Sequence, residues 1–158
     1  MKTNIIHLFT VLFLVTVNTV IAQQTSCSLP LQNAKTGKSI NSCIKSDPDK
    51  IQAIIGKASA IDKQVYEKDE APIFTLTYDG LVIEMQNGQI KSIIITNKKW
   101  KLNGLTIGTN YDSVVTKHEL IKKMYAADFN FKIKDTRGCL FIDVDALKNV
   151  IKIGAVFL

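Results

Sequence analysis

The sequence has few of the residues from which catalytic and metal-binding sites are built. It contains two histidines, three cysteines and one tryptophan in 158 residues. His7 lies in the N-terminal apolar segment, which leaves His118 as the one histidine beyond it. A metal site needs several converging ligands, and a hydrolytic site needs a base beside a nucleophile. No residue near His118 supplies either, so we expect a surface histidine, no bound metal, no cofactor and no enzymatic activity.

Two further candidates for chemistry lack supporting residues as well. Cys139 would need His118 or another base beside it to act as a nucleophile. Asp143 and Asp145 lie on one face of a predicted strand and could pair as acid and base or hold a cation. The spacing of acids found in calcium-binding loops is absent. We therefore interpret the two carboxylates as solvent-facing groups beside a turn.

Long hydrophobic runs are also scarce, because only the N-terminus contains one. Residues 1–22 have Lys2 near the start, an apolar run from Ile5 to Ile21, and Ala22 at the end of the run. This pattern predicts a secretory signal peptide that is cleaved after Ala22. The alternative, an uncleaved anchor, needs about 20 unbroken apolar residues, and this run is shorter and contains Asn18. We expect a periplasmic or secreted protein with no stable membrane insertion after cleavage.

The basic residues are not concentrated in one segment of the sequence. The chain has 20 basic and 14 acidic residues, a net charge of +6, or +5 once Lys2 leaves with the signal peptide. The lysines are scattered in ones and twos along the chain. Nucleic-acid binding would favour a basic stripe with interleaved aromatic residues, and export also argues against it. A basic surface can still steer a partner with an acidic surface.

All three cysteines, Cys27, Cys43 and Cys139, lie beyond the signal peptide, so one disulfide and one free thiol are expected in an oxidising compartment. We favour a bond between Cys27 and Cys43, because closing a loop of about 15 residues would stabilise the N-terminal segment by roughly 3 kcal/mol. Pairing of Cys43 with Cys139 would join that segment to the C-terminal half, and the sequence leaves it open.

Residues 23–45 are polar and show no period, which predicts an irregular segment held by the disulfide. A short amphipathic helix follows over Pro48–Ile55, with Asp47 as N-cap, proline at the first helical position and Gly56 as the stop. Its inward side chains are expected to be Ile51, Ile54 and Ile55. A further strand is expected near Ile61–Tyr66.

The clearest pattern is a three-stranded meander in residues 73–97. Asp79-Gly80 and Asn87-Gly88 each favour a two-residue type I′ hairpin turn. These turns set a register in which Leu76 faces Ile83, Met85 faces Ile90, and Glu84 faces Lys91. The predicted core face comprises Phe74, Leu76, Tyr78, Leu81, Ile83, Met85, Ile90 and Ile94. The opposite face comprises Thr75, Thr77, Val82, Glu84, Lys91, Ile93 and Ile95.

The second half repeats this order. Asn110 caps a helix that is expected to run to Lys123, with Leu120, Ile121 and Met124 on its inward side. Three strands with alternating apolar residues follow over 128–134, 140–144 and 151–157. The sequence thus predicts an α+β fold in which two helices cover one face of an antiparallel sheet. Residues 46–97 and 105–158 would be duplicated units of a single domain, 46–158; the alternative is that two meanders preceded by helices simply share a pattern.

One segment combines a strand end, a glycine, a polar N-cap, an acid in the first turn and an aliphatic residue six positions after the glycine. It is Ile107-Gly108-Thr109-Asn110-Tyr111-Asp112-Ser113-Val114. This segment resembles the β-lactamase-inhibitor-protein-like fold, which small outer-membrane assembly lipoproteins share. The resemblance covers Ser46 to Leu158 in element order, although the first half lacks the glycine and the chain lacks a lipidation cysteine. It implies a protein-binding module rather than an enzyme.

The candidate binding residues are Lys98, Lys99, Trp100 and Lys101. An exposed tryptophan among cations would suit an acidic protein partner, because aromatic anchors dominate interfaces. The alternative is that Trp100 packs on Ile93 and Ile95 and the lysines only solvate the connector, which we favour because tryptophan is usually largely buried. The predicted function is an exported protein-binding module, such as an inhibitor or immunity protein against a toxic or lytic enzyme. The alternative is a structural or envelope-assembly module with no enzyme target.

Overall fold

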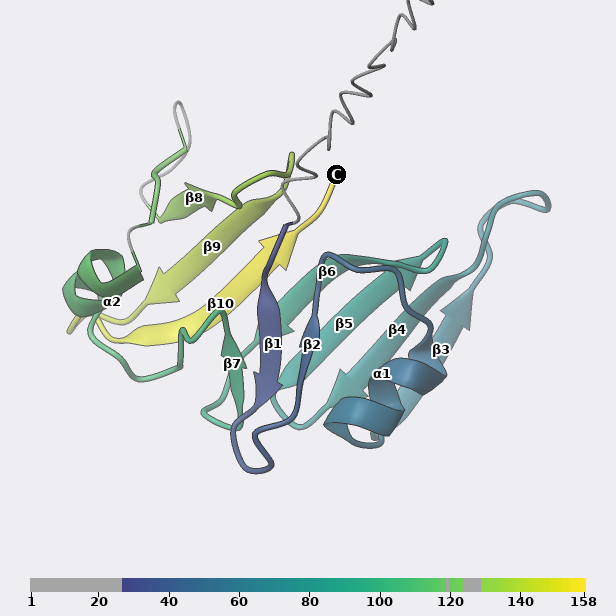
Figure 1. Ribbon diagram of the computed structural model, residues 1–158, viewed down its shortest axis with the longest axis horizontal. Helices are drawn as coiled ribbons and strands as arrows, with labels where there is room; N and C mark the ends of the chain where they lie inside the picture. Colours follow the sequence, from purple (N-terminus) through teal and green to yellow (C-terminus); the bar gives the residue numbers. More distant parts are fainter. Residues whose placement is uncertain (1–26, 119, 124–128) are drawn as a thin grey trace, which may run out of the picture.

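The computed structural model describes residues 27–118, 120–123 and 129–158, so the predicted signal peptide lies outside the described residues. These residues have the predicted α+β class, with two helices and ten strands in two antiparallel sheets (Figure 1). The elements are β1 (Pro30–Asn33), β2 (Ser39–Asn41), α1 (Pro48–Ile55), β3 (Ala60–Gln64), β4 (Ile73–Tyr78), β5 (Leu81–Gln86), β6 (Gln89–Ile95), β7 (Trp100–Leu102), α2 (Tyr111–His118), β8 (Asn130–Lys132), β9 (Cys139–Val144) and β10 (Val150–Val156). Within the described residues, neither helix is long and apolar enough to cross a membrane.

The larger sheet has seven strands in the order β3-β4-β5-β6-β10-β9-β8. The two predicted meanders, β4-β5-β6 and β8-β9-β10, therefore meet through their last strands, and β6 pairs antiparallel with β10. The expected strand near Ile61–Tyr66 is β3, which pairs with β4 at one edge. This order places one meander on each side of the β6–β10 pair, whereas duplication of the two units remains a prediction.

The hairpin turns determine the register of the first meander only in part. The β4–β5 register is as predicted, with Leu76 opposite Ile83. Between β5 and β6 the register shifts by one residue after the Met85–Ile90 pair, so that Glu84 faces Ser92 rather than Lys91. Such a bulge transfers every later side chain to the other face.

The bulge corrects the predicted core. Ile93 and Ile95 are buried, whereas Ile94 is only half-buried on the opposite face. Phe74 is also half-buried, with the Lys63 ammonium 5.8 Å from its ring centre. The face of the sheet that carries Ile94 contains no buried side chain in the first meander, and it comprises Thr75, Thr77, Val82, Glu84, Ser92 and Ile94.

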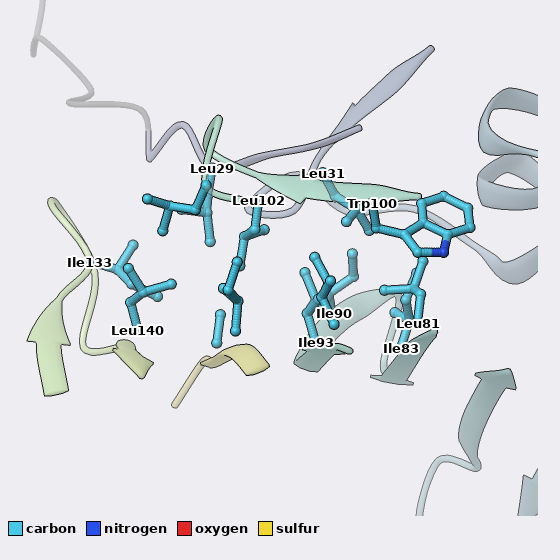
Figure 2. Close-up of a cluster of buried hydrophobic side chains, with 14 of the residues drawn as sticks. Leu29, Leu31, Leu81, Ile83, Ile90, Ile93, Trp100, Leu102, Ile133 and Leu140 are labelled. Atoms are coloured by element: carbon cyan, nitrogen blue, oxygen red, sulfur yellow. The ribbon is translucent and has the colours of Figure 1, made fainter. Parts of the chain in front are cut away.

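A second, three-stranded sheet with the order β2-β1-β7 covers the other face. The prediction of an irregular segment over residues 23–45 is wrong here, because β1 and β2 form a hairpin and β1 also pairs with β7. Leu31 and Leu102 are opposite each other in the register and fully buried. Their side chains point toward Ile90 and Ile93 of the larger sheet (Figure 2). The core therefore lies mainly between two sheets, with α1 beside β2 of the smaller one and α2 near the β9–β10 end of the larger one (Figure 1).

Helix α1 has the predicted bounds and cap. The Asp47 carboxylate accepts a hydrogen bond from the Lys50 amide at 2.8 Å. This bond lowers the pKa of Asp47, because it favours the charged form. Ile51 and Ile55 are buried as expected, but Ile54 is 41% exposed, because it lies at an open groove beside β2.

Helix α2 is shorter than predicted. The Asp112 amide donates to the Asn110 side chain at the predicted cap, but the helix ends at His118 rather than at Lys123. The backbone at residues 121–123 instead lies beside β8, where Lys132 N donates to Ile121 O and Lys123 N donates to Asn130 O. Pairing with an otherwise open strand edge thus replaces the last helical turn. The predicted inward Met124 lies outside the described residues.

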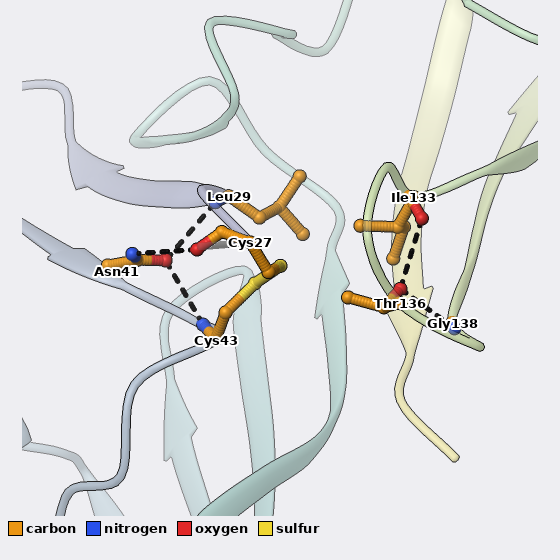
Figure 3. The surroundings of a disulfide bond; sticks show 7 residues. All are labelled: Cys27, Leu29, Asn41, Cys43, Ile133, Thr136 and Gly138. Carbon is orange, nitrogen blue, oxygen red and sulfur yellow. Dashed lines mark hydrogen bonds between the residues drawn. A yellow bond between two sulfur atoms is a disulfide. The ribbon is translucent and has the colours of Figure 1, made fainter. Parts of the chain in front are cut away.

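The disulfide joins Cys27 to Cys43, as predicted, and Cys139 is free. Asn41 fixes the segment around the bond (Figure 3). Its side-chain oxygen accepts from the amides of Leu29 and Cys43, and its side-chain nitrogen donates to the Cys27 carbonyl. The bond therefore closes one end of the β1–β2 hairpin.

Candidate binding site

Two of the predicted binding residues, Lys99 and Trp100, line a groove of about 460 Å³ between the smaller sheet, the end of α1 and the β4–β5 turn. We call it the basic groove. Its lining residues are Asn33, Lys35, Ile55, Gly56, Lys57, Ser59, Tyr78, Asp79, Lys99 and Trp100. These residues come from four separate parts of the sequence, so the groove exists only in the folded chain.

Trp100 belongs to the wall of the groove but is not exposed. Its side chain is 5% exposed, and the indole Nε1–H donates to the Asp79 carbonyl oxygen at 2.9 Å. Tyr78 packs edge-on against it, with ring centres 5.2 Å apart. Figure 2 shows the indole beside Leu81 and Ile83, on the face to which the bulge brings Ile93. The interpretation of Trp100 as an exposed anchor is therefore wrong, and the favoured one, a tryptophan packed on the sheet, agrees with its burial.

Three lysines form the rim of the groove: Lys35 from the β1–β2 turn, Lys57 from the end of α1, and Lys99 from the start of β7. All three are exposed. Lys99 forms an ion pair with Asp79, whereas Lys35 and Lys57 form none with any described residue. The rim therefore carries an excess of positive charge.

Asn33 holds two sides of the groove together. Its side-chain nitrogen donates to the Ile55 carbonyl at the end of α1, at 3.1 Å. Its side-chain oxygen accepts from the amides of Lys35 and Thr36. One side chain thus satisfies a helix carbonyl that has no partner in the helix and orders the turn that carries Lys35.

The Tyr78 hydroxyl is the one polar group of the floor that lacks a partner in the described structure. The residue is 7% exposed, and its oxygen makes no hydrogen bond. Burial raises the pKa of Tyr78 to about 12, because the phenolate would be poorly solvated. A buried hydroxyl without a partner costs about 1–3 kcal/mol, so this one is available for a hydrogen bond to a ligand or a water molecule.

The two outer lysines of the predicted cluster lie elsewhere. Lys98 is exposed and extends over Gly108, and Lys101 alternates with the buried Trp100 and Leu102 on the outer side of β7. Conversely, Lys35 and Lys57 were not predicted as binding residues. They lie far from Lys99 in the sequence. The pairing of β1 with β7 brings Lys35 to Lys99, and the hydrogen bond from Asn33 to Ile55 joins the end of α1, which carries Lys57, to the same region.

The residues considered above for catalysis or cation binding do not form a common site. Asp143 forms an ion pair with Lys152 at 3.2 Å, and the Asp145 carboxylate accepts from the amides of Leu147 and Asn149 in the turn before β10. These hydrogen bonds, above all that from Asn149, lower the pKa of Asp145. His118 is half-buried rather than on the surface, and desolvation together with the charge of Lys117 lowers its pKa.

In the part of the chain that the structure describes, no group of three or more histidine, cysteine, aspartate or glutamate residues could hold a metal ion. A comparison of the chain with models of protein families, with characterised proteins and with solved structures finds no match.

Proposed function

We propose that the protein is an exported module that binds another protein and that its basic groove receives an acidic segment of that partner. The observation that carries the proposal is the convergence of Lys35, Lys57 and Lys99 on the rim of one groove. Two of these cations have no ion-pair partner among the described residues, so a carboxylate from a partner would not have to displace one. The net charge of +5 that the chain keeps after loss of Lys2 would also steer an acidic surface toward the protein.

The floor of the groove adds the apolar part of such a contact. The ring of Tyr78 and the indole of Trp100 are rigid and already packed, so binding would cost little side-chain entropy. The Tyr78 hydroxyl supports the same chemistry, because it has a hydrogen to donate and no partner. An acidic side chain next to an apolar one is the kind of segment that this combination favours.

Export is part of the proposal. The disulfide between Cys27 and Cys43 is of a kind that persists in oxidising compartments, and the N-terminal 22 residues have the pattern of a signal peptide. We therefore place the mature protein in the periplasm or outside the cell. The resemblance at residues 107–114 favours the more specific form, an inhibitor or immunity protein that neutralises a toxic or lytic enzyme.

The test begins with residues 23–158, oxidised and immobilised, as bait for proteins of the exported fraction. The double variant Lys35→Glu/Lys57→Glu should lose the partner, because two attractive charges become repulsive. The variant Lys68→Glu/Lys45→Glu makes the same change of charge at exposed positions away from the groove and should retain it. Equal loss in both variants would show that only net charge matters and would refute the groove as the site.

Assays with a purified partner then distinguish an inhibitor or immunity protein from an assembly module. If it is an enzyme, an equimolar amount of this protein should abolish its activity, and the groove variant should not. A stable complex with an envelope protein that leaves every measured activity unchanged would instead support the assembly module.

A further inference from the structure

A second cavity lies beside the disulfide, away from the basic groove. It encloses about 290 Å³ and is bounded by the Cys27–Cys43 bond, the start of β6, the β8–β9 turn and the end of β10. Figure 3 shows the disulfide and the facing β8–β9 turn, which carries Thr136 and Gly138. Its volume is near the lower end of the roughly 300–1,000 Å³ that small-molecule sites occupy. The cavity would therefore suit a small ligand.

The wall of this cavity contains a buried hydroxyl without a partner. Ser42 is 2% exposed, and its side-chain oxygen makes no hydrogen bond in the structure. The neighbouring hydroxyl, that of Thr136, is different, because it donates to the Ile133 carbonyl and accepts from the Gly138 amide. Of these two hydroxyls of the wall, that of Ser42 is therefore the one that can still donate a hydrogen bond.

Two cations line the same cavity. Lys91 lies at the bulge of β6 and is half-buried, and Arg137 lies in the β8–β9 turn. Neither forms an ion pair with a described residue, and this includes Asp135, the acidic side chain of the lining. Arginine binds a carboxylate with two parallel hydrogen bonds, and lysine adds a point charge.

The rest of the wall is largely apolar. Ile90 is buried, Phe157 is half-buried, and the disulfide forms one side. The side chain of Asn41 holds the backbone on both sides of the disulfide, so this part of the wall is already ordered. A ligand that fits must combine one anionic group with a short apolar or aromatic body.

We propose that this cavity binds a small monocarboxylate with an apolar tail. The carboxylate lies between Arg137 and Lys91 and accepts a hydrogen bond from Ser42, and the tail packs on Ile90 and Phe157. The site is separate from the basic groove and does not depend on the function proposed for that groove. It would let a small organic acid bind beside the bond that closes the β1–β2 hairpin.

The test uses residues 23–158 with the disulfide intact and phenylacetate as the probe, with phenylacetamide as the neutral probe of the same shape. Titration followed by amide chemical shifts should give saturable changes at Ser42, Lys91 and Arg137 with phenylacetate only. Arg137→Gln should weaken binding at least about tenfold, as expected for a hydrogen bond to a charged group worth about 1.5–3 kcal/mol. Lys68→Gln removes one charge at an exposed position outside both sites and should leave the affinity unchanged.

Ser42→Ala separates binding from folding. Because the hydroxyl has no partner, its removal should leave the melting temperature of the free protein unchanged or raised, while the affinity for phenylacetate falls several-fold. Equal affinity for the acid and the amide, or an equal effect of Arg137→Gln and Lys68→Gln, would overturn the proposal. So would shifts that do not saturate or that arise away from the cavity.

Discussion

Replacement of Trp100 tests whether the smaller sheet is packed as part of the core. The side chain is 5% exposed, contacts Tyr78 edge-on and donates a hydrogen bond to Asp79. Truncation of a buried tryptophan to alanine costs about 3–5 kcal/mol. Since a domain of this size is stable by about 5–15 kcal/mol, Trp100→Ala should remove a large fraction of the free energy of unfolding.

A smaller change separates packing from the hydrogen bond. Trp100→Phe keeps most of the apolar area and loses the indole N–H. The Asp79 carbonyl would remain satisfied, because it also accepts from the Asn97 side chain at 3.1 Å. The expected cost is therefore about 1–2 kcal/mol, made up of one ordinary hydrogen bond and some lost contact area.

The assay is urea unfolding followed by far-ultraviolet circular dichroism, because the variants lack the one tryptophan that fluorescence would report. Lys101→Ala, on the outer side of the same strand, serves as the control and should change the free energy of unfolding by no more than about 0.5 kcal/mol. If Trp100→Ala lowers the free energy of unfolding by less than about 1 kcal/mol, the packing is refuted, because truncation of a buried side chain of this size costs more than that.

Two further predictions concern the disulfide and the buried phenol. The double variant Cys27→Ser/Cys43→Ser should lower the free energy of unfolding by about 3 kcal/mol, because the bond closes a loop with a sequence separation of 16; an unchanged melting temperature on reduction of the wild type would contradict it. For Tyr78, the folded pKa of about 12 lies above the ordinary value of 10.0, so the unfolded chain loses its proton first and stability should fall as the pH rises from 10 to 12. Tyr78→Phe should remove the part of this slope that Tyr78 contributes, and it should be neutral or stabilising at pH 7, because the hydroxyl has no partner; an unchanged slope in the variant would contradict the assignment.

The elements that could be predicted from the sequence are those that local chemistry specifies. Helix α1 has a cap, a proline and a stopping glycine within ten residues, and its predicted bounds are the observed ones. Asn87 and Gly88 both have positive φ, as the predicted type I′ turn requires. At Asp79-Gly80 only the glycine does, so the prediction of type I′ is wrong for that turn, although each turn sets the first pairs of its hairpin. Capping and turn formation depend on a few adjacent residues, so a single sequence contains the necessary information.

The register of β6 could not be predicted in the same way. Ile93, Ile94 and Ile95 are all apolar, so alternation does not show which face each one occupies. The bulge that decides it depends on pairing with both β5 and β10. A run of apolar residues on both faces of a strand lacks the alternation from which a register is read.

The smaller sheet and the basic groove depend on pairing between strands that are far apart in the sequence. Strands β1, β2 and β7 have only three or four residues each, too few for a reliable period. The alternation of Trp100 and Leu102 around Lys101 was a signal for β7, but nothing near it indicates that Leu31 is its partner. Lys35 and Lys57 consequently join Lys99 only through tertiary structure.

The position of β10 has a consequence for how the chain folds. It is the last strand of the sequence, yet it lies inside the seven-stranded sheet, between β6 and β9. The seven-stranded sheet is therefore incomplete until β10, an interior strand, has been added. Until then β6 presents an unpaired, isoleucine-rich edge, which is the kind of edge on which nascent chains aggregate. Folding of the sheet should be slow, because the pairing of β6 with β10 joins strands that are far apart in the sequence.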